Sequence, residues 1–289
     1  MTQIIANGIR LEFEQYGDEL RTPIILVRGL GTQLIDWPVE LVQGLVKEGF
    51  RVIVFDNRDV GLSEKFEGLP DLGGVARGEQ EPPYRLEDMA GDIVGLMDSL
   101  EVRQAYLFAI SMGGMIGQVM AANHGERLLG FFSVMSSSGR KGLPDATTEA
   151  KAILEAETEP DAGTDEIIQV AAEGLRICGS PGYPMSADDR LAIVRNRLEW
   201  NYTPEGVVRQ MAAVLAGRDR AELLESITVP TMVIHGEDDP LVPVEHGIDT
   251  ANSIHGASIE LVPGMGHDLP PALMHHMVDV IVAFTGHPI

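Results

Sequence analysis

The chain has 289 residues, 44% of them hydrophobic, and it carries 44 acidic against 21 basic residues, a formal charge of −23. This length and hydrophobic content predict a globular protein with a sizeable core and exclude an intrinsically disordered chain. The acidic balance, with no basic cluster to offset it, excludes binding to nucleic acid or to an anionic membrane surface.

The cysteine content and the hydropathy narrow the class further. The single cysteine, Cys178, excludes an internal disulfide and a thiolate metal cluster. The N-terminus alternates like a strand and lacks the basic start and apolar core of a leader peptide. No stretch approaches the roughly 18 continuous apolar residues of a membrane span. We therefore expect a cytoplasmic protein with no membrane partner.

The first half of the chain alternates short apolar strands with helices. Residues 3–16 form two alternating segments joined at Asn7-Gly8, a strong hairpin signal. A continuous apolar run, typical of a strand buried on both faces, covers residues 23–27, a second buried strand is expected at 51–55, and another strand at 128–135. Helical spacing marks residues 38–47 and 86–100, with a Gly- and Pro-rich loop over 67–83. This alternation predicts parallel βαβ units, whose functional residues gather at the carboxyl ends of the strands.

Residues 105–123 are typical of a strand, a sharp turn and a helix. The apolar run ends at Ser111, and Gly113 and Gly114 follow as a helical pattern begins. Small residues around such a turn let it hold a serine in a strained backbone conformation that lifts its Oγ above the sheet. This is the pattern of the nucleophile elbow of serine hydrolases, except that Ala109 replaces the first glycine of G-x-S-x-G.

Residues 140–226 break the alternation. They show no clear buried strand and contain helix-like segments at about 147–157, 163–177, 187–199 and 204–216. We interpret them as a helical cap inserted into a core domain formed by residues 1–139 and 227–289. The sheet resumes after the cap, with strands at 230–235 and 258–262 and a terminal helix at 271–284.

The loops after the last two strands carry an acid and a base. Asp238 and Asp239 lie in the turn after the first of these strands, and the second strand is followed by Gly264-Met265-Gly266-His267. A free serine is a weak nucleophile that needs a base, and the base needs an orienting group. The order serine, acid, histidine is that of the α/β hydrolases.

The chain resembles α/β-hydrolase-fold enzymes of the cap-bearing group that includes carboxylesterases, lactonases and aclacinomycin-methylesterase-like proteins. The resemblance covers nearly the whole chain. The motifs on which it rests are the elbow, Arg28-Gly29-Leu30-Gly31, Asp56-Asn57-Arg58, Gly236 to Pro243, and Gly266-His267. It implies a mostly parallel twisted sheet of about eight strands flanked by helices.

The same resemblance assigns roles to single residues. It implies a catalytic triad of Ser111, His267 and Asp239, with Asp238 as the competing acid. It also implies an oxyanion hole formed by the backbone N–H groups of Leu30 and Met112. A triad of this kind needs no metal and no organic cofactor.

Arg28 departs from the family, which usually has histidine at this position. One interpretation is a structural salt bridge to Asp56 or to an acidic residue of the cap, and the other is a cation that faces a substrate carboxylate or carbonyl. Asp56 and Arg58 are expected to form a structural pair. Substrate-binding candidates, expected to border an apolar pocket, are Arg28, Trp37, Tyr183 and Trp200.

The predicted reaction is hydrolysis of a carboxylic ester of a small or medium apolar molecule through an acyl-enzyme. Dehalogenases and epoxide hydrolases of this fold use Asp at the elbow, so Ser111 argues against both. Lactonase, carbon–carbon bond hydrolase, acyltransferase and cofactor-free perhydrolase activities stay open because they share the triad. A non-catalytic ligand receptor on the same fold also stays open. A nucleotide-dependent redox enzyme lacks support, since no G-x-G-x-x-G follows the first buried strand.

Overall fold

The computed structural model describes residues 2–154, 163–217 and 219–286. One sheet in the order β1-β2-β4-β3-β5-β6-β7-β8 is formed by β1 (Thr2–Ala6), β2 (Ile9–Tyr16), β3 (Thr22–Val27), β4 (Phe50–Phe55), β5 (Ala105–Ile110), β6 (Leu128–Val134), β7 (Thr231–Gly236) and β8 (Ser258–Val262). β1 and β2 form the predicted hairpin, and β2 runs antiparallel to β4. All other neighbours pair in parallel, which confirms the predicted fold class.

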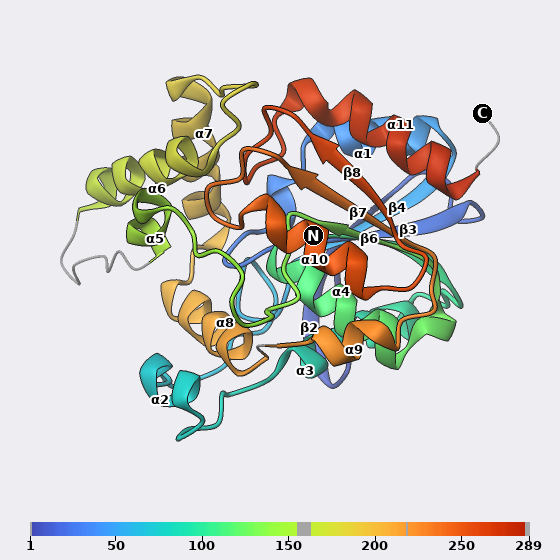
Figure 1. The fold of residues 1–289 in the computed structure, drawn as a ribbon, viewed down its shortest axis with the longest axis horizontal. Coiled ribbons are helices and arrows are strands. Elements are labelled where there is room, and N and C mark those ends of the chain that lie inside the picture. The colour runs from blue at the N-terminus through green and yellow to red at the C-terminus, as the bar shows by residue number, and fades with distance from the viewer. Residues whose placement is uncertain (1, 155–162, 218, 287–289) are drawn as a thin grey trace.

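The central strands are buried on both faces, as their continuous apolar runs predict. Ile24 and Leu26 of β3 belong to the apolar core on one face, and Ile25 and Val27 to the core on the other. The first core includes helices α1 (Val39–Lys47) and α11 (Met274–Thr285), and the second includes α3 (Leu86–Ser99) and α4 (Met112–Asn123). Figure 1 shows these two helix layers on opposite sides of the sheet. The central strands therefore present only their ends to a ligand.

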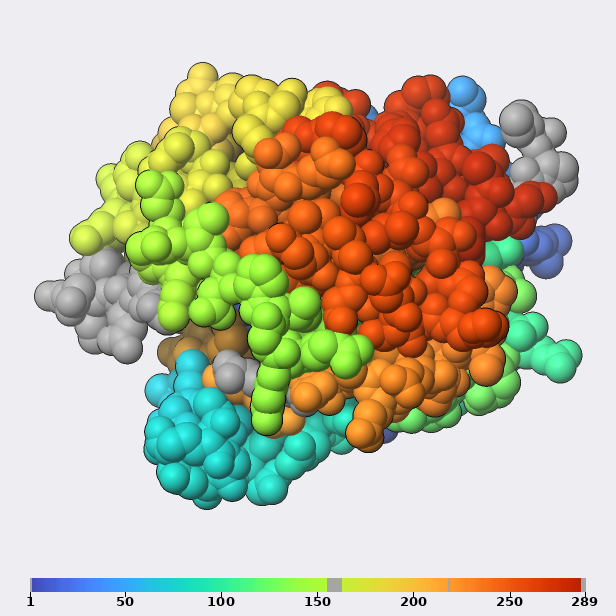
Figure 2. Space-filling view, in the orientation of Figure 1, coloured from blue at the N-terminus to red at the C-terminus, as the bar shows by residue number. Residues whose placement is uncertain are grey.

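Residues 140–226, which we call the helical segment, lie between β6 and β7 in the chain. They contain α5 (Thr148–Leu154), α6 (Thr164–Cys178), α7 (Ala187–Asn201), α8 (Pro204–Ala216) and α9 (Ala221–Glu225), with no strand among the described residues. The predicted end of the first helix, 155–157, lies outside the described residues. α6 and α7 pack together through Ile168, Ala172 and Val194. The helices α5 to α7 form one end of the molecule, beside the sheet (Figure 1 and Figure 2).

Several short helices differ from the sequence prediction. α2 (Leu72–Arg77) lies inside the predicted loop, and neither α9 nor α10 (Val244–Ser253) matches a predicted helix. Gly247 inside α10 weakens its helical signal, yet a Cβ there would lie 2.5 Å from Nδ1 of the buried His235. Single turns of 3₁₀ helix are η1 (Leu34–Asp36), η2 (Gly125–Arg127) and η3 (Pro271–Leu273). None of the described helices is long and apolar enough to cross a membrane.

The predicted pair between Asp56 and Arg58 is wrong. Arg58 donates two hydrogen bonds to the carboxylate of Asp92 in α3, at 2.7 and 2.6 Å. Its guanidinium also lies over the rings of Phe66 and Tyr84, 5.2 and 4.9 Å from their centroids. Because α3 packs against β1 and α4, its Asp92 reaches Arg58 in the turn that follows β4, and this packing fixes the pair.

Replacing Asp92 by asparagine is expected to lower the free energy of unfolding by about 3–5 kcal/mol, because the buried guanidinium of Arg58 loses its counter-charge. The side chains of Arg58 and Asp92 are only 5% and 2% exposed, so water cannot replace the lost carboxylate. Urea denaturation followed by circular dichroism measures the change. Asp98→Asn is the control on the same helix, because Asp98 is 64% exposed and its pair with Arg127 contributes little. Equal losses in the two variants would contradict the argument.

Candidate active site

Ser111 stands between β5 and α4, in a turn that its small neighbours permit. Its backbone has φ 55° and ψ −122°, a strained conformation for a residue other than glycine. A Cβ on Gly113 would lie 2.4 Å from the carbonyl oxygen of Val27, and a Cβ on Gly29 would lie 3.0 Å from the Cβ of Ser111. The glycines therefore let the turn press against the end of β3.

The alanine at the start of this turn is accommodated by a glycine in the following helix. Ala109 is fully buried. A Cβ on Gly117 of α4 would lie only 3.3 Å from the Cβ of Ala109 and 2.4 Å from the ring of Phe131. Because Gly117 has no side chain, the helix packs closely on the strand despite the extra methyl group. The departure from G-x-S-x-G is thus compensated eight residues further along the chain.

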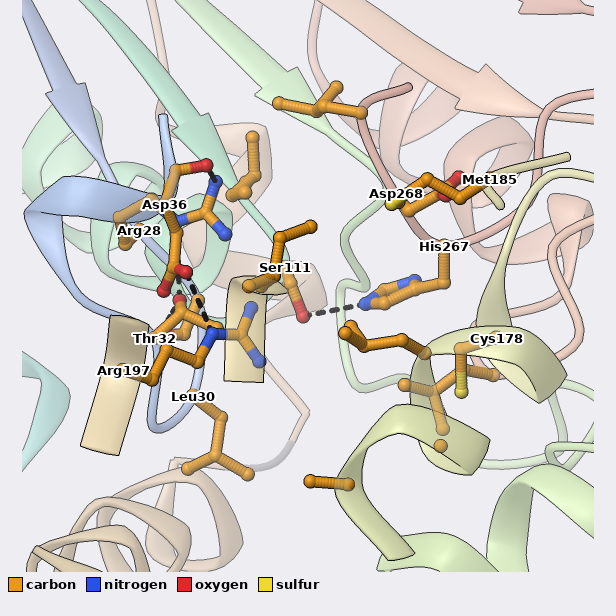
Figure 3. A pocket seen from close by; sticks show the side chains of 18 of the residues that line it. Arg28, Leu30, Thr32, Asp36, Ser111, Cys178, Met185, Arg197, His267 and Asp268 are labelled. Carbon is orange, nitrogen blue, oxygen red and sulfur yellow. Dashed lines mark hydrogen bonds and ion pairs between the residues drawn. The ribbon is translucent and has the colours of Figure 1, made fainter. Parts of the chain in front are cut away.

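Ser111, Asp239 and His267 come together from the ends of β5, β7 and β8. Nε2 of His267 lies 3.0 Å from Oγ of Ser111, and Nδ1 of the same ring lies 2.7 Å from Oδ2 of Asp239. Figure 3 shows the ring of His267 pointing at Ser111. These distances are those that proton transfer requires. The competing acid, Asp238, instead accepts the N–H of Gly264 at 2.9 Å.

The environment of Asp239 keeps its carboxylate charged. Burial alone would raise its pKa, but His267 and the N–H of Val242 outweigh burial and hold the pKa below its ordinary value. Oδ1 accepts the N–H groups of Leu241 and Val242, at 2.9 and 2.8 Å, so Oδ2 faces His267. Because a charged carboxylate only accepts hydrogen bonds, the network assigns the ring proton to Nδ1 and leaves Nε2 as an acceptor toward Ser111.

The loop that carries His267 is hydrogen-bonded to the helical segment. The N–H of His267 donates to the carbonyl oxygen of Cys178 at 2.7 Å, and the N–H of Gly266 donates to Oγ of Ser180 at 2.9 Å. A Cβ on Gly266 would lie 2.5 Å from the carbonyl oxygen of Gly179, so the glycine permits the contact. Burial raises the pKa of Cys178 to about 11, which leaves this thiol protonated and unreactive at neutral pH.

The backbone N–H groups of Leu30 and Met112 are available to a ligand. Met112 is the first residue of α4, where backbone N–H groups lack partners within the helix. Leu30 lies in the turn after β3, and within the described part of the chain neither N–H group donates to another backbone group. The N–H of Gly31 donates to Oε1 of Gln210 in α8 at 2.9 Å, which fixes this turn. No sequence motif points to Gln210, so its hydrogen bond to the turn could be found only from the packing of α8 in the structure.

Ser111 and His267 line a cavity of about 1130 Å³ whose walls come from the core and from the helical segment. Of the substrate-binding candidates, Arg28, Trp37 and Tyr183 line this cavity. Much of the remaining lining is apolar and includes Ile35, Met115, Met135, Leu175, Met185 and Met211. Such a cavity suits a largely apolar small molecule. Among the residues that the structure describes, no group of three or more His, Cys, Asp or Glu side chains is placed to hold a metal ion.

Asp56 has a structural role: it accepts hydrogen bonds from three N–H groups, none of which belongs to Arg28. Its Oδ1 accepts the N–H of Leu34 at 2.7 Å, and its Oδ2 accepts the N–H of Leu62 at 2.8 Å and the indole N–H of Trp200 at 3.0 Å. Burial raises the pKa of Asp56 to about 6. The predicted salt bridge from Arg28 to Asp56 is therefore absent among the described contacts. Trp200, a substrate-binding candidate, is held by Asp56 and does not line the cavity.

The fold and the site geometry define an α/β hydrolase, and the comparisons with known proteins agree. The family model described as alpha/beta hydrolase fold matches residues 22–170, just over half of the chain, so the chain belongs to this family. It is 28% identical to rhodomycin D methylesterase DnrP of Streptomyces peucetius, over 98% of each chain. It is 26% identical to 3-oxoadipate enol-lactonase 2 of Acinetobacter baylyi, over 96% of this chain and 95% of the relative.

A solved structure supports the fold independently. The enol-lactonase of Burkholderia xenovorans aligns with a TM-score of 0.74 at 24% identity, over 99% of this chain and 100% of that one. At this level of identity the likeness concerns the fold alone. The predicted resemblance to the α/β-hydrolase esterase and lactonase group is confirmed.

Proposed function

We propose that this protein is a serine hydrolase that cleaves carboxylic esters through an acyl-enzyme. The observation that carries the proposal is the continuous chain of hydrogen bonds from Ser111 through His267 to Asp239. The methylesterase and the enol-lactonase among its relatives support ester hydrolysis as the reaction class. The role of each residue then follows from the ring proton on Nδ1 of His267, which leaves Nε2 free to accept the proton of Ser111.

In the first half of the reaction, Nε2 of His267 accepts the proton of Ser111 while Oγ attacks the carbonyl carbon of the ester. The imidazolium that forms is stabilised by the charged Asp239, 2.7 Å away. The N–H groups of Leu30 and Met112 stabilise the negative charge on the carbonyl oxygen. His267 then gives its proton to the departing alkoxide, which leaves as an alcohol and an acyl-serine remains.

In the second half, water attacks the acyl-serine as His267 removes its proton, and His267 then returns that proton to Oγ of Ser111 as the carboxylic acid departs. We assign the helical segment 140–226 the role of a cap over a core of residues 1–139 and 227–289. Its contacts with the His267 loop and with the turn that carries Leu30 support this role, since it fixes both the base and an oxyanion donor. It also supplies one wall of the cavity and so limits the size of the substrate.

Lactone hydrolysis is the second candidate, favoured by the 3-oxoadipate enol-lactonase relative. A lactone is an internal ester, so the same attack, oxyanion and proton transfers apply. The alkoxide stays attached to the acyl chain, and the product is a single hydroxy acid. The cavity of about 1130 Å³ is large enough for either kind of substrate.

Labelling with a fluorophosphonate tests the proposal. The native protein is expected to take up one phosphonyl group per chain at Ser111, and labelled protein is expected to lose its hydrolysis of p-nitrophenyl butyrate. Peptide mass spectrometry locates the label. Ser137 is an internal control, because its Oγ lies 2.7 Å from Nδ1 of His246 but Nε2 of that ring faces the carbonyl oxygen of Pro144 and no carboxylate. A label at Ser137, or no label at all, would overturn the proposal.

A further inference from the structure

One end of the cavity carries two arginines, although the chain as a whole is strongly acidic. Arg28 directly precedes Gly29, the residue packed against Ser111, and Arg197 belongs to α7 of the helical segment. Both arginines line the cavity. Figure 3 shows them on the side of Ser111 opposite to His267, each joined by a dashed line to Asp36. A ligand that reaches Ser111 is thus close to two guanidinium groups.

The Arg28 guanidinium is buried without a carboxylate hydrogen-bond partner. The residue is 7% exposed. Its Nε donates to Oγ1 of Thr32 and its Nη1 to the backbone carbonyl of Asp36, both at 3.3 Å, and it lies over the ring of Trp37. Its Nη2 has no partner within the described residues. Burial lowers the pKa of Arg28 to about 10, opposed by Asp36 and reinforced by Arg197, so the group is still charged at neutral pH.

Among the described residues, a single carboxylate, that of Asp36, serves this end of the cavity. Its Oδ1 accepts Nε–H of Arg197 at 2.7 Å, and its Oδ2 accepts the N–H of Gln33 at 2.8 Å. Both Nη groups of Arg197 remain without a partner within the described residues, and the side chain is 21% exposed. Two cations and one anion leave a net positive charge here, and a buried cation without a counter-charge of its own costs stability. A ligand that supplies the missing negative charge would offset that cost.

The other acidic side chains in the described lining of the cavity, Asp189 and Asp268, are engaged elsewhere. Asp268 accepts a hydrogen bond from Oγ of Ser180, and Figure 3 places it on the His267 side of the cavity. Asp189 accepts a hydrogen bond from Ser186 at the start of α7. Neither therefore neutralises the two arginines, and the positive end of the cavity is open to an anion.

The position of Arg197 is fixed before any ligand arrives. Nε2 of Gln33 donates to the backbone carbonyls of Arg197 and Asn201, at 3.2 and 2.9 Å. The turn after β3 thus holds the end of α7 beside Arg28. Because the side chain of Gln33 is buried and both contacts join the core to the helical segment, the two guanidinium groups are preorganised for one ligand.

We infer that the substrate carries a carboxylate, which Arg28 and Arg197 bind while the scissile carbonyl lies at Ser111. The inference rests on the proposed function. The planar guanidinium groups match the two oxygens of a carboxylate, and the unpartnered Nη groups supply the donors. The apolar lining of the cavity suits a hydrocarbon chain between the two ends of the substrate. The substrate class is therefore a half-ester of a dicarboxylic acid, or a lactone that bears a free carboxylate.

A matched pair of esters tests the inference. Monomethyl adipate is compared with the methyl ester in which an isopropyl group replaces the carboxylate, which keeps the shape and removes the charge. The native enzyme is expected to prefer the half-ester by roughly 10- to 100-fold in kcat/KM. Arg28→Met and Arg197→Met are each expected to bring this ratio close to one, mainly through KM. The series from monomethyl succinate to monomethyl pimelate covers the distance between the two sites.

Arg195→Met is the matched control, since Arg195 is exposed on α7 and does not line the cavity, and its ratio should equal that of the native enzyme. If Arg28→Met does not fold, Arg197→Met carries the test alone. A native enzyme that turns over the neutral ester at least as well as the half-ester at every length overturns the inference and leaves the proposed function standing. Turnover of neither ester, with no label at Ser111, overturns both.

Discussion

Replacing Ser111 by alanine is expected to lower kcat for ester hydrolysis by at least about 10,000-fold, because without Oγ no acyl-enzyme forms. The base remains, with Nε2 of His267 facing the space that Oγ filled 3.0 Å away. The oxyanion donors also remain, so the residual activity is that of water activated in a preorganised pocket. The strained backbone at Ser111 is set by its neighbours rather than by the hydroxyl, so the fold is expected to persist.

The measurement is hydrolysis of p-nitrophenyl butyrate, with thermal unfolding of each variant as the check on the fold. Ser137→Ala is the matched control, because Ser137 also contacts a histidine nitrogen but lies in a pair that has no acid. We expect this control to stay within severalfold of the native rate. If Ser111→Ala retained the native kcat, or if Ser137→Ala lost as much activity, the nucleophile would be misassigned.

The elbow could be predicted from the sequence because its determinants are local. The apolar run of β5 and the glycines after Ser111 are next to one another in the chain, and each is required by contacts of the turn itself, such as that of Gly113 with Val27. The same holds for the parallel strands, since a run such as 23–27 that is buried on both faces must be continuously apolar. Signals of this kind do not depend on how distant elements pack.

The partners of the buried charges could not be predicted in this way. Asp56 and Arg58 are two positions apart in the sequence, yet Arg58 pairs with Asp92 of α3, which packs against β1 and α4. Which side chains meet is decided by the packing of elements far apart in the chain. The partner of Asp36, Arg197, comes from more than 150 residues further along, and no spacing rule connects the two.

The short helices α2 and α10 could not be predicted from the sequence for a different physical reason. Glycine lowers the helical signal, and α2 contains Gly73 and Gly74 while α10 contains Gly247. At Gly247 the space is taken by the ring of His235, so packing, rather than propensity, selects the residue. Tertiary contacts therefore stabilise α10 where its own sequence does not.

Replacing Asp239 by asparagine is expected to lower kcat by roughly 10,000-fold, because it places the proton of His267 on the wrong nitrogen. Oδ1 of Asp239 accepts two backbone N–H groups, so the amide oxygen of asparagine must take this position. The amide NH₂ then occupies the place of Oδ2 and donates to Nδ1 of His267. With Nδ1 an acceptor, the proton moves to Nε2, which faces Ser111 and can no longer take its proton.

Asp238→Asn is the control, one residue away in the same turn. The carboxylate of Asp238 accepts only the N–H of Gly264 at 2.9 Å among the described contacts, and its loss is expected to change kcat by less than about tenfold. The low-field NMR resonance of the Nδ1 proton of His267, hydrogen-bonded to Asp239, reports which ring nitrogen carries the proton. It therefore separates a loss of activity through the wrong tautomer from a loss through unfolding. It should be present in the native protein and in Asp238→Asn and missing in Asp239→Asn. A variant of Asp239 that kept both this resonance and the native kcat would show that another group orients the histidine.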